Sequence, residues 1–354
     1  MATQGTVLST LPKDLPLDFL RNSTDNFSAD RIIGTGGFGT VYLGIMPDRE
    51  PIAVKKLAEN APVTRVKAFT NEVQNIMALQ TNDNIVKLVG YCHEGQKKVV
   101  LNNGRYIVAD VFESLLCYEY LPKGSLQKNL FGTEKERPRN MAWHMRFSII
   151  KGICNGLLFL HSIPIIHMDL KPQNILLDDE MMPKIADFGL SRLFGQEQTR
   201  ANTQNVVGSY GYIAPEYLYR GEISAQSDIY SLGLLIIETT IVKKNQPNQN
   251  QPSARPFIEE VRQDWTNDYI ASRCSNLSAN ELQEVKVCIE IGLECVDIDR
   301  KKRPSIENIV DRLNGRCANQ VRQLTVDWIR GSVLRPLSFI SPPVPGEHEN
   351  GVFS

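Results

Sequence analysis

A glycine-rich run near the start of the chain restricts the fold more than any other feature. Within residues 34–39, glycine occupies the first, third, fourth and sixth positions, namely Gly34, Gly36, Gly37 and Gly39. A backbone without Cβ atoms can approach a phosphate closely and offer it N–H donors. A dinucleotide-binding unit would continue with a helix, but 51–55 reads Pro-Ile-Ala-Val-Lys and predicts a second strand. The pattern therefore predicts a strand-loop-strand, and no G-x-x-x-x-G-K-[ST] motif supports a P-loop.

Two opposite charges follow in positions where charge is uncommon. Lys55 ends an otherwise apolar strand, so it is either a surface lysine or the partner of an anion. Glu72 lies in an expected helix at roughly 67–80, on the face shared with Phe69 and Val73. A carboxylate on that face points inward and would position Lys55, although many helices carry a solvated glutamate. Lys55, positioned by Glu72, is therefore a candidate ligand for an anion.

The strongest local signal is the run His167-Met-Asp-Leu-Lys-Pro-Gln-Asn174, followed after a short spacer by Asp187-Phe-Gly189. Phosphoryl transfer to a hydroxyl needs a carboxylate that orients the hydroxyl and accepts its proton, and a cation for the transferred phosphate. It also needs oxygen ligands for a divalent metal ion. The residues that match these roles are Asp169 as the carboxylate, Lys171 as the cation, and Asn174 and Asp187 as metal ligands.

These motifs identify a family resemblance. The chain resembles a eukaryotic protein kinase over roughly residues 28–315, and specifically the plant receptor-like and Pelle (interleukin-receptor-associated) type. The segments that carry the finer likeness are 26–28, 34–44, 88–93, 118–126, 208–216 and 227–233, with Trp143 and Arg146. The resemblance implies an α+β, bilobal fold, in which a small lobe of antiparallel sheet and one main helix sits on a larger, mostly helical lobe.

The pattern of apolar residues agrees with two lobes. Short β-branched runs, such as 52–54 and 85–89, fill the first part, and beyond Pro122 apolar residues recur at steps of three and four. We expect an N-terminal flank at 1–26, a small lobe at 27–120, a large lobe at 121–316 and a mostly irregular tail at 317–354. The apolar stretch 231–242 is too short to span a membrane and predicts a buried helix, followed by an exposed loop at 243–253.

The resemblance also implies an ATP site and its metal, Mg²⁺ or alternatively Mn²⁺. The glycine loop and Lys55 would hold the phosphates, and Glu72 would hold Lys55. Tyr118 would be the gatekeeper residue behind the adenine, and the backbone of 119–121 would form the hinge that binds it. The remaining residues of the expected adenine pocket are Val41, Ala53, Glu119, Leu121 and Leu176.

Further roles follow from the same resemblance. Asp228 would brace the backbone of the catalytic loop, and Glu216 would pair with Arg303. The Lys171-Pro-Gln-Asn174 form resembles serine/threonine kinases rather than tyrosine kinases. Serine/threonine specificity is therefore expected, with dual specificity left open.

The catalytic loop departs from the regulated kinases at one residue. Met168 stands where many of them carry an arginine that binds a phosphate on the activation segment. We expect the order of residues 187–216 to depend less on phosphorylation than in those kinases. Thr199, Thr203 and Ser209 remain available for modification.

A second departure is the stretch 96–113, which is longer than a tight turn. Its Asn102-Asn-Gly104 sequence predicts a hairpin tip. An inert surface loop is the favoured interpretation, with partner docking as the alternative.

Composition excludes some classes of function. A formal net charge of -1 over 354 residues gives no basic field for nucleic acid. Seven scattered cysteines, none in a C-x-x-C pair, favour a reducing compartment over a disulfide framework. We expect a cytoplasmic protein without a membrane span, peripheral at the plasma membrane only through partners.

The expected partners are a protein substrate and a membrane receptor or co-receptor kinase, in receptor-like signalling that includes defence. The chain is expected to be either a receptor-like cytoplasmic kinase or the kinase part of a longer receptor. The alternatives are a pseudokinase scaffold and a kinase of small molecules. The scaffold is disfavoured because the catalytic set is complete, and the small-molecule kinase because 208–216 resembles a peptide-docking platform.

Overall fold

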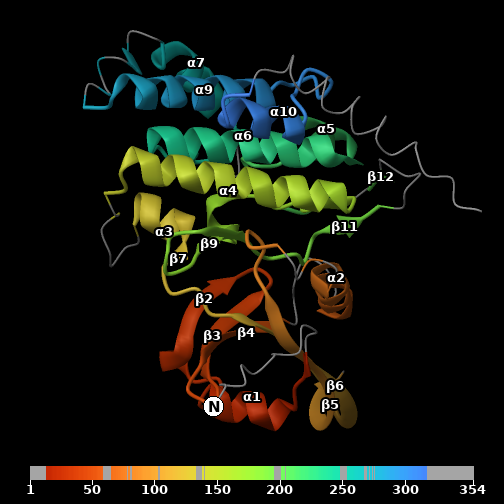
Figure 1. Cartoon of the computed structure of the whole chain (residues 1–354). Coiled ribbons are helices and arrows are strands. Elements are labelled where there is room, and N and C mark those ends of the chain that lie inside the picture. Colours follow the sequence, from red (N-terminus) through yellow and green to blue (C-terminus); the bar gives the residue numbers. More distant parts are fainter. Residues whose placement is uncertain are drawn as a thin grey trace, which may run out of the picture.

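The chain folds into two lobes, one rich in strands and one rich in helices (Figure 1). The computed structural model describes residues 13–316, apart from 59–64, 78, 80–81, 103, 133–137, 139, 195–200, 204, 248–252, 267–268, 271, 273 and 275. The expected tail at 317–354 lies outside the described residues. The expectation of an α+β fold with a strand-rich small lobe and a mostly helical large lobe is confirmed.

The small lobe is built on one six-stranded sheet with the order β1-β5-β6-β4-β3-β2. Every neighbouring pair is antiparallel except β1 and β5. β4 is central, and its Ile52 and Val54 are buried, as a sheet packed on one core requires. The strands are β1 (Lys13–Asp14), β2 (Ile32–Gly36), β3 (Gly39–Ile45), β4 (Pro51–Leu57), β5 (Leu88–Asn102) and β6 (Arg105–Glu119).

The expected hairpin at 96–113 is present and belongs to much longer strands. β5 and β6 pair without a break from Gly90 opposite Cys117 to Asn102 opposite Arg105. Gly104 has a φ of 76°, which suits glycine at the turn. At the other end, the apolar run 85–89 was expected to be a strand, but β5 begins at Leu88 and Ile85 makes only an isolated bridge to Ile185.

The main helix of the small lobe is α2 (Arg65–Met77), which begins two residues before the helix expected at roughly 67–80 and ends three residues before it. Phe69, Val73 and Ile76 are buried, and Glu72 between them is fully buried as well. The spacing of three and four residues puts all four on one face of the helix. α2 therefore carries its one buried carboxylate toward the sheet and the other lobe.

A short helix, α1 (Leu17–Ser23), lies against the sheet at the far end of the small lobe, although residues 1–26 were expected to flank it. Leu17 and Leu20 are buried in a core that includes Ile52 and Cys117. The Leu17 N–H donates to Glu94 Oε1 at 2.6 Å, which satisfies a free amide of the first turn. Residues 13–23 thus contribute to the small lobe, while 1–12 lie outside the described residues.

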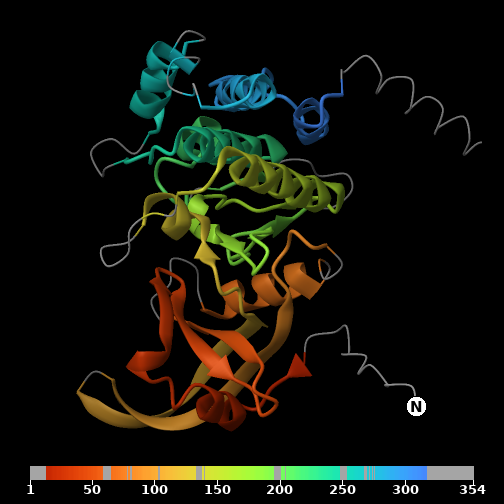
Figure 2. The same ribbon diagram turned by 60° about the vertical axis from the view of Figure 1, so that its left-hand side comes forward.

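The large lobe is a stack of helices around α6 (Ala225–Ile241), as Figures 1 and 2 show. Every residue of α6 from 227 to 240 is buried, so the expected buried helix is confirmed. α9 (Ala279–Cys295) approaches α6 closely, because Gly233 and Gly292 face each other; a Cβ on Gly233 would lie 2.5 Å from Cys295 Cβ. After α6 the chain is irregular at 243–247, as expected, and 248–252 lie outside the described residues.

The remaining elements complete the lobes. They are the turns η1 (Ala29–Arg31) and η2 (Pro172–Asn174), the helices α3 (Leu126–Phe131), α4 (Trp143–Ser162), α5 (Pro215–Arg220), α7 (Arg255–Asp264) and α10 (Ile306–Leu313), and the strands β7 (Gly124–Ser125), β8 (Ile165–Ile166), β9 (Ile175–Leu177), β10 (Pro183–Ile185), β11 (Arg192–Leu193), β12 (Ala201–Asn202) and β13 (Glu222–Ile223). Of the helices in the described ranges, none combines the length and the apolar character that crossing a bilayer requires.

A buried ion pair fastens the segment before α6 to the end of the large lobe. Arg303 donates from Nη1 and Nη2 to the two carboxylate oxygens of Glu216, each at 2.7 Å. Both side chains are almost fully buried. The predicted contact between Glu216 and Arg303 is therefore confirmed, and its two parallel bonds fix α5 in orientation.

The packing of α1 yields a test of its place in the small lobe. We expect Leu20→Ala to lower the free energy of unfolding by about 2–5 kcal/mol, because it leaves a cavity in a closed core. Urea denaturation measures the change. The exposed neighbour Asp18→Ala is the control and should change stability by less than about 0.5 kcal/mol. Equal stabilities of Leu20→Ala and the native chain would show that α1 does not hold this position.

Candidate active site

The glycine loop has the predicted strand-loop-strand form, with β2 and β3 joined by a tight turn at 37–38. Gly39 has a φ of 148°, and a Cβ there would lie 2.1 Å from the Lys56 carbonyl oxygen. The protein backbone alone therefore requires glycine at 39. At Gly36 and Gly37 an added Cβ would meet no described atom within 4 Å, so the protein's own packing does not require those two glycines.

Lys55 is the centre of a buried charge cluster. Its Nζ donates to Asp187 Oδ1 at 2.7 Å and to the two oxygens of Glu72 at 3.1 and 3.0 Å. The three side chains come from β4, from α2 and from the segment after β10. Lys55 and Glu72 are only 7% and 0% exposed, which decides between the two interpretations of the sequence: neither is a surface charge.

Burial and the partners act in opposite directions on these groups. Burial lowers the pKa of Lys55, but the carboxylates of Asp187 and Glu72 outweigh it and hold that pKa above its ordinary value. Burial likewise raises the pKa of Asp187, and Lys55 outweighs it, so the pKa of Asp187 falls below its ordinary value. For Glu72 burial dominates and its pKa rises, although Lys55 opposes the rise. Glu72 is therefore the first carboxylate of the cluster to be protonated as the pH falls.

Tyr118 joins the same cluster from β6. Its hydroxyl donates a short hydrogen bond to Glu72 Oε1, which lowers the pKa of Glu72. Tyr118 is buried beside β4, where it lies opposite Ala53. The predicted gatekeeper position is thus tied to the α2 carboxylate, a contact that sequence reasoning did not predict.

A column of three rings supports α2 on the face that packs against the sheet. Phe69 lies one turn before Glu72 and stacks on His93, with ring centroids 5.1 Å apart. His93 in turn stacks on Phe112 of β6 at 5.0 Å, and its Nδ1 contacts Ser114 Oγ at 2.9 Å. The orientation of α2, and so the place of Glu72, depends on the base of the β5–β6 hairpin.

The backbone of the catalytic loop is held by Asp228 of α6, as predicted. Its carboxylate accepts from the N–H groups of His167 at 2.8 Å and Met168 at 2.9 Å, and lies 3.1 Å from His161 Nε2. Met168 has a φ of 71°, which is costly for a residue with a side chain, about 1–3 kcal/mol. The two hydrogen bonds stabilise that conformation, so α6 sets the position of the next residue, Asp169.

The predicted catalytic residues come together around Asp169. Lys171 Nζ donates to Asp169 Oδ2 at 2.6 Å, and Asn174 Nδ2 donates to the Asp169 carbonyl oxygen at 2.9 Å. Asn174 also contacts Oδ2 at 3.2 Å. Asp169 is almost buried, at 3% exposure.

Ser209 is a member of this site that the sequence analysis named only as a place for modification. Its N–H donates to Asp169 Oδ1 at 3.1 Å, and its hydroxyl accepts from Lys171 Nζ at 2.6 Å. A serine 40 residues away carries no signal of its own. The one available clue is its place in the 208–216 segment, which the resemblance associates with peptide docking.

The expected adenine pocket is lined from both lobes. Val41 and Ala53 are half-buried on neighbouring strands of the small lobe, and Leu176 is half-buried on β9 of the large lobe. Leu121, in the connection between them, is only 7% exposed. Within the part of the chain that the structure describes, its N–H has no protein acceptor, whereas the Glu119 N–H donates to the Lys87 carbonyl at 3.0 Å. Leu121 thus offers a donor at the hinge.

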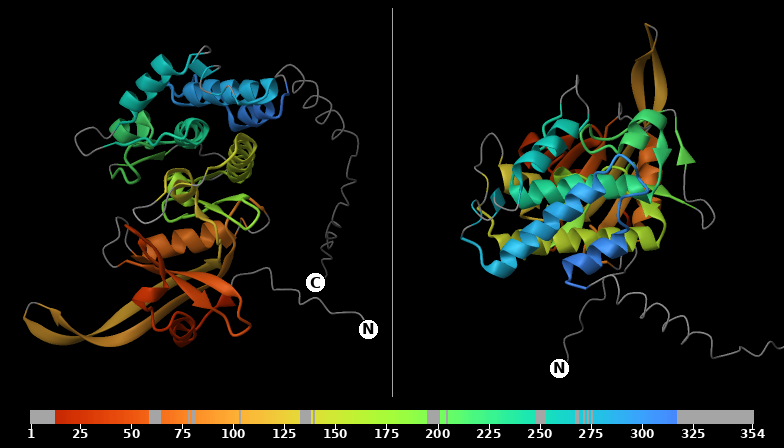
Figure 3. Two further views of the ribbon diagram at one scale, coloured as in Figure 1. Left: turned by 90° about the vertical axis from the view of Figure 1, so that its left-hand side faces the viewer. Right: turned by 90° about the horizontal axis from the view of Figure 1, so that it is seen from above.

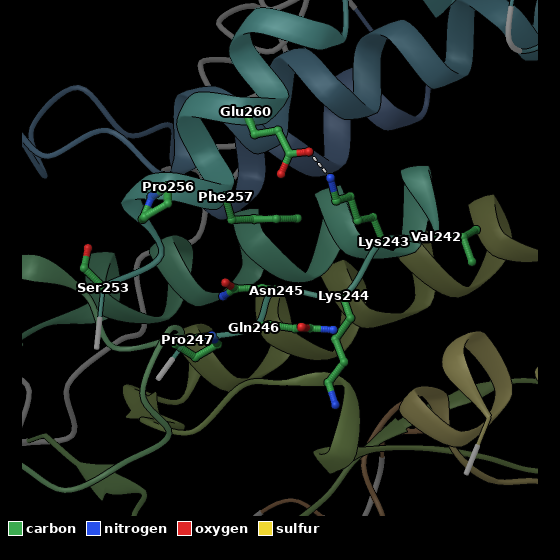
Figure 4. Close-up of a pocket in the computed structure, with 10 residues that line it drawn as sticks. All are labelled: Val242, Lys243, Lys244, Asn245, Gln246, Pro247, Ser253, Pro256, Phe257 and Glu260. Carbon is green, nitrogen blue, oxygen red and sulfur yellow. Dashed lines mark hydrogen bonds and ion pairs between the residues drawn. The ribbon is translucent and has the colours of Figure 1, made fainter. Parts of the chain in front are cut away.

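A pocket of about 470 Å³ lies elsewhere, between the end of α6 and α7 (Figure 4). In it Lys243 pairs with Glu260, while Phe257 lies over its centre and Lys244 points away from both. None of the predicted catalytic or nucleotide-binding residues lines it. Because the paired charges gather where the two lobes meet, the candidate active site lies there and not in this hollow.

Comparison with known proteins agrees with this geometry. Residues 27–313 match the family model described as "Protein kinase domain". Cysteine-rich receptor-like protein kinase 25 of Arabidopsis thaliana is 37% identical over 313 residues, which cover 87% of this chain and 43% of that protein. Cysteine-rich receptor-like protein kinase 37 of the same plant is 39% identical over 306 residues, covering 83% of this chain and 44% of its own length.

A third relative belongs to a different group of receptors. The G-type lectin S-receptor-like serine/threonine-protein kinase SRK of Arabidopsis thaliana is 40% identical over 299 residues, which cover 81% of this chain and 33% of that protein. The chain spans less than half the length of each of these relatives. The chain therefore belongs to the protein kinase domain family and is similar to the receptor-like kinases of plants.

Proposed function

We propose that this chain transfers the γ-phosphate of Mg-ATP to serine and threonine hydroxyls of proteins. The observation that carries the proposal is the convergence of Asp169, Lys171 and Asn174 in one hydrogen-bonded group. A pseudokinase scaffold needs no such group. The Lys55–Glu72–Asp187 cluster, which an inactive fold also has no reason to keep buried and paired, supports the same conclusion.

Asp169 is the residue that receives the substrate. Its carboxylate is held by a buried backbone and by Ser209 N–H, so an incoming hydroxyl meets an oriented acceptor for its proton. Lys171 Nζ lies at 2.6 Å from both Asp169 Oδ2 and Ser209 Oγ, which places one cation between the base and the docking segment. That cation would stabilise negative charge on the phosphate as it is transferred.

The donor set fits a divalent metal ion with oxygen preference. Asp187 and Asn174 supply a carboxylate and an amide oxygen, and the pKa of Asp187 is held below its ordinary value by Lys55 despite burial. These residues would hold Mg²⁺, which supplies charge neutralisation on the phosphate oxygens when bound. Mn²⁺ has the same ligand preference and is the second candidate.

The nucleotide-binding role rests on groups that the protein's own packing does not use. Gly36 and Gly37 face open space, where a backbone can approach phosphates. The Leu121 N–H, with no acceptor in the described chain, suits a ring nitrogen of adenine at the hinge. Lys55 would extend to the phosphates from its place beside Glu72.

The wider role is proposed from the relatives. Several carry names of receptor-like kinases, and one is named a serine/threonine-protein kinase. We infer a cytoplasmic kinase that receives its signal from a membrane receptor or co-receptor kinase and phosphorylates a protein, with defence as one setting. Serine/threonine specificity is supported by the 171–174 motif and by Ser209, which ties the docking segment to Lys171.

The first test removes the proposed metal ligand. We expect Asp187→Asn to reduce transfer of labelled γ-phosphate onto a generic protein by at least about a hundredfold, because the loss removes stabilisation of charge in the transition state. Asp179→Asn, an exposed carboxylate in the same lobe, is the control and should change the rate less than about twofold. Equal rates for Asp187→Asn and the native chain would refute the mechanism. Retained ATP binding with no transfer by the native chain would establish the scaffold instead.

The second test concerns the activation segment. Met168 packs in an apolar cluster with Phe194, Tyr217 and Ile223. Residue 168 therefore offers no positive charge that a phosphate on the activation segment could bind. We expect Thr203→Ala to retain kcat/KM within about tenfold of the native chain, a difference of about 1.4 kcal/mol in barrier. Thr199→Ala should behave alike, although Thr199 lies outside the described residues. A larger loss with intact folding, or inactivation of the native chain by a phosphatase, would contradict this.

The third test uses the hydroxyl of Tyr118. Its hydrogen bond favours ionised Glu72, and burial already raises the pKa of Glu72. Tyr118→Phe should therefore raise the pKa of Glu72 further. On acidification, kcat/KM of the variant should begin to fall at a higher pH than that of the native chain, and the two values of kcat/KM should become equal at high pH. Tyr106→Phe, on an exposed tyrosine, is the control and should leave the profile unchanged. If the fall of kcat/KM at low pH occurs at the same pH in Tyr118→Phe as in the native chain, or at a lower pH, the role of ionised Glu72 is contradicted.

A further inference from the structure

Tyr217 of α5 has a buried hydroxyl that binds a residue outside its own helix. The hydroxyl accepts a hydrogen bond from the Val207 N–H at 2.9 Å and donates one to the Val207 carbonyl oxygen at 3.0 Å. Among the residues that the structure describes, no other group bonds to the backbone of Val207. The attachment of the chain at Val207 therefore depends on one side chain.

The ring of Tyr217 makes a second set of contacts. It lies in the apolar cluster of Met168, Phe194 and Ile223, and Met168 directly precedes Asp169. A phenylalanine ring would fill the same space, so packing alone does not require the hydroxyl. Tyr217 thus packs beside the catalytic loop through its ring and binds the activation segment, residues 187–216, through its hydroxyl.

Val207 lies two residues before Ser209, which contacts the catalytic groups. The Ser209 N–H donates to Asp169 Oδ1, and the Ser209 hydroxyl accepts from Lys171 Nζ. Gly208 joins Val207 to Ser209, and a glycine restricts the chain less than any other residue does. The position of Ser209 therefore depends on how firmly Val207 is held.

The helix that carries Tyr217 is itself fixed. The preceding residue, Glu216, is anchored by the two hydrogen bonds of its buried ion pair. Further along the segment, the Tyr212 hydroxyl donates to Glu238 Oε2 of α6 at 2.7 Å. Residues 207–212 are therefore attached to the large lobe at both ends, and neither attachment uses a phosphate.

A role in stability alone is the alternative, because buried tyrosine hydroxyls usually find a partner. Both groups that bind the Tyr217 hydroxyl, however, belong to the activation segment and not to a helix of the core. They also lie within two residues of the serine that contacts the catalytic carboxylate. These two observations favour a role in placing the segment.

We propose that Tyr217 is a positioning residue for phosphoryl transfer, whose hydroxyl holds Val207 and thereby keeps Ser209 in the active site. The inference rests on the proposed kinase function and adds a residue to it. Met168 carries no charge that could bind a phosphate on the activation segment, and the Tyr217 hydroxyl supplies an uncharged attachment in the same part of the molecule. A protein substrate that docks on residues 208–216 therefore meets an ordered surface.

Steady-state kinetics of Tyr217→Phe test the proposal, since the variant keeps the ring and loses only the hydroxyl. We expect KM for a protein substrate to rise at least about fivefold and KM for ATP to stay within about twofold of the native value. The glycine loop and Lys55 belong to the small lobe, whereas α5, in green, lies in the large lobe, as the left view of Figure 3 shows. A protein that is merely less stable would show a lower kcat with both KM values unchanged.

The matched control is Tyr219→Phe on the same helix. Tyr219 is 73% exposed, so its hydroxyl is solvated and its loss should leave kcat and both KM values within about twofold of the native values. A rise of KM for the protein substrate in Tyr219→Phe as large as that in Tyr217→Phe would overturn the assignment to Tyr217.

A double-mutant cycle with Ser209→Ala tests whether Tyr217 acts through Ser209. Two residues that act through one contact are not additive. We expect Tyr217→Phe to lower kcat/KM for the protein substrate at least about fivefold in the native chain and less than about twofold in the Ser209→Ala background. The full effect in both backgrounds would overturn the proposed route.

Hydrogen exchange provides a measurement that does not depend on catalysis. We expect the Val207 amide to exchange at least about tenfold faster in Tyr217→Phe than in the native chain, while the amides of α6 keep their protection. Unchanged exchange at Val207, with normal transfer by the native chain, would overturn this role alone. Absence of transfer by the native chain would refute the proposed function, and the positioning role with it.

Discussion

The contact of Lys55 with the buried carboxylate of Glu72 and the half-buried carboxylate of Asp187 is the interaction on which the rest of the site depends. Lys55 and Glu72 are stable as ions in this position only while they remain paired, because an unpaired buried charge costs several kcal/mol. The groups come from β4, α2 and the large lobe. The sheet, the helix and the second lobe are therefore held in one relative arrangement by the same cluster. Tyr118 and the ring column through Phe69 add further support to the carboxylate on α2.

In the large lobe, a buried carboxylate likewise holds part of the site in place, but it binds backbone N–H groups. Asp228 accepts hydrogen bonds from two successive N–H groups and so stabilises Met168 in the left-handed region. A buried carboxylate of α6 thereby fixes the residue that precedes Asp169. Since every residue of α6 from 227 to 240 is buried, the position of the Asp169 carboxylate depends on the core of the lobe as well as on the loop that carries it.

The residues in linear motifs were predictable, and those defined by distant contacts were not. Asp169, Lys171, Asn174 and Asp187 follow one another at fixed spacings, and the chemistry of phosphoryl transfer accounts for each. The two lobes follow from the change of apolar period along the chain. Ser209 has no such context, since only the folded chain brings its hydroxyl to Lys171.

Some elements of the fold were likewise not predictable from the sequence. Helix α1 has two turns and follows a proline, so its apolar period was too short to detect, although Leu20 is buried. The polar run at 96–98 concealed how far β5 extends, because a ribbon exposed on both faces need not alternate apolar and polar residues. Thr199 and the tail at 317–354 lie outside the described residues, so the expectations about them remain predictions.

The bond between Tyr118 and Glu72 has a consequence for synthetic ligands. A large side chain that is held by its own hydroxyl changes rotamer less readily than a free aromatic ring, so the hydrogen bond to ionised Glu72 keeps Tyr118 in place. At the proposed adenine site we expect flat compounds that stop at the hinge to fit, and compounds with a bulky extension past Tyr118 to be excluded. The carboxylate that positions Lys55 therefore also limits how far a ligand can extend past Tyr118.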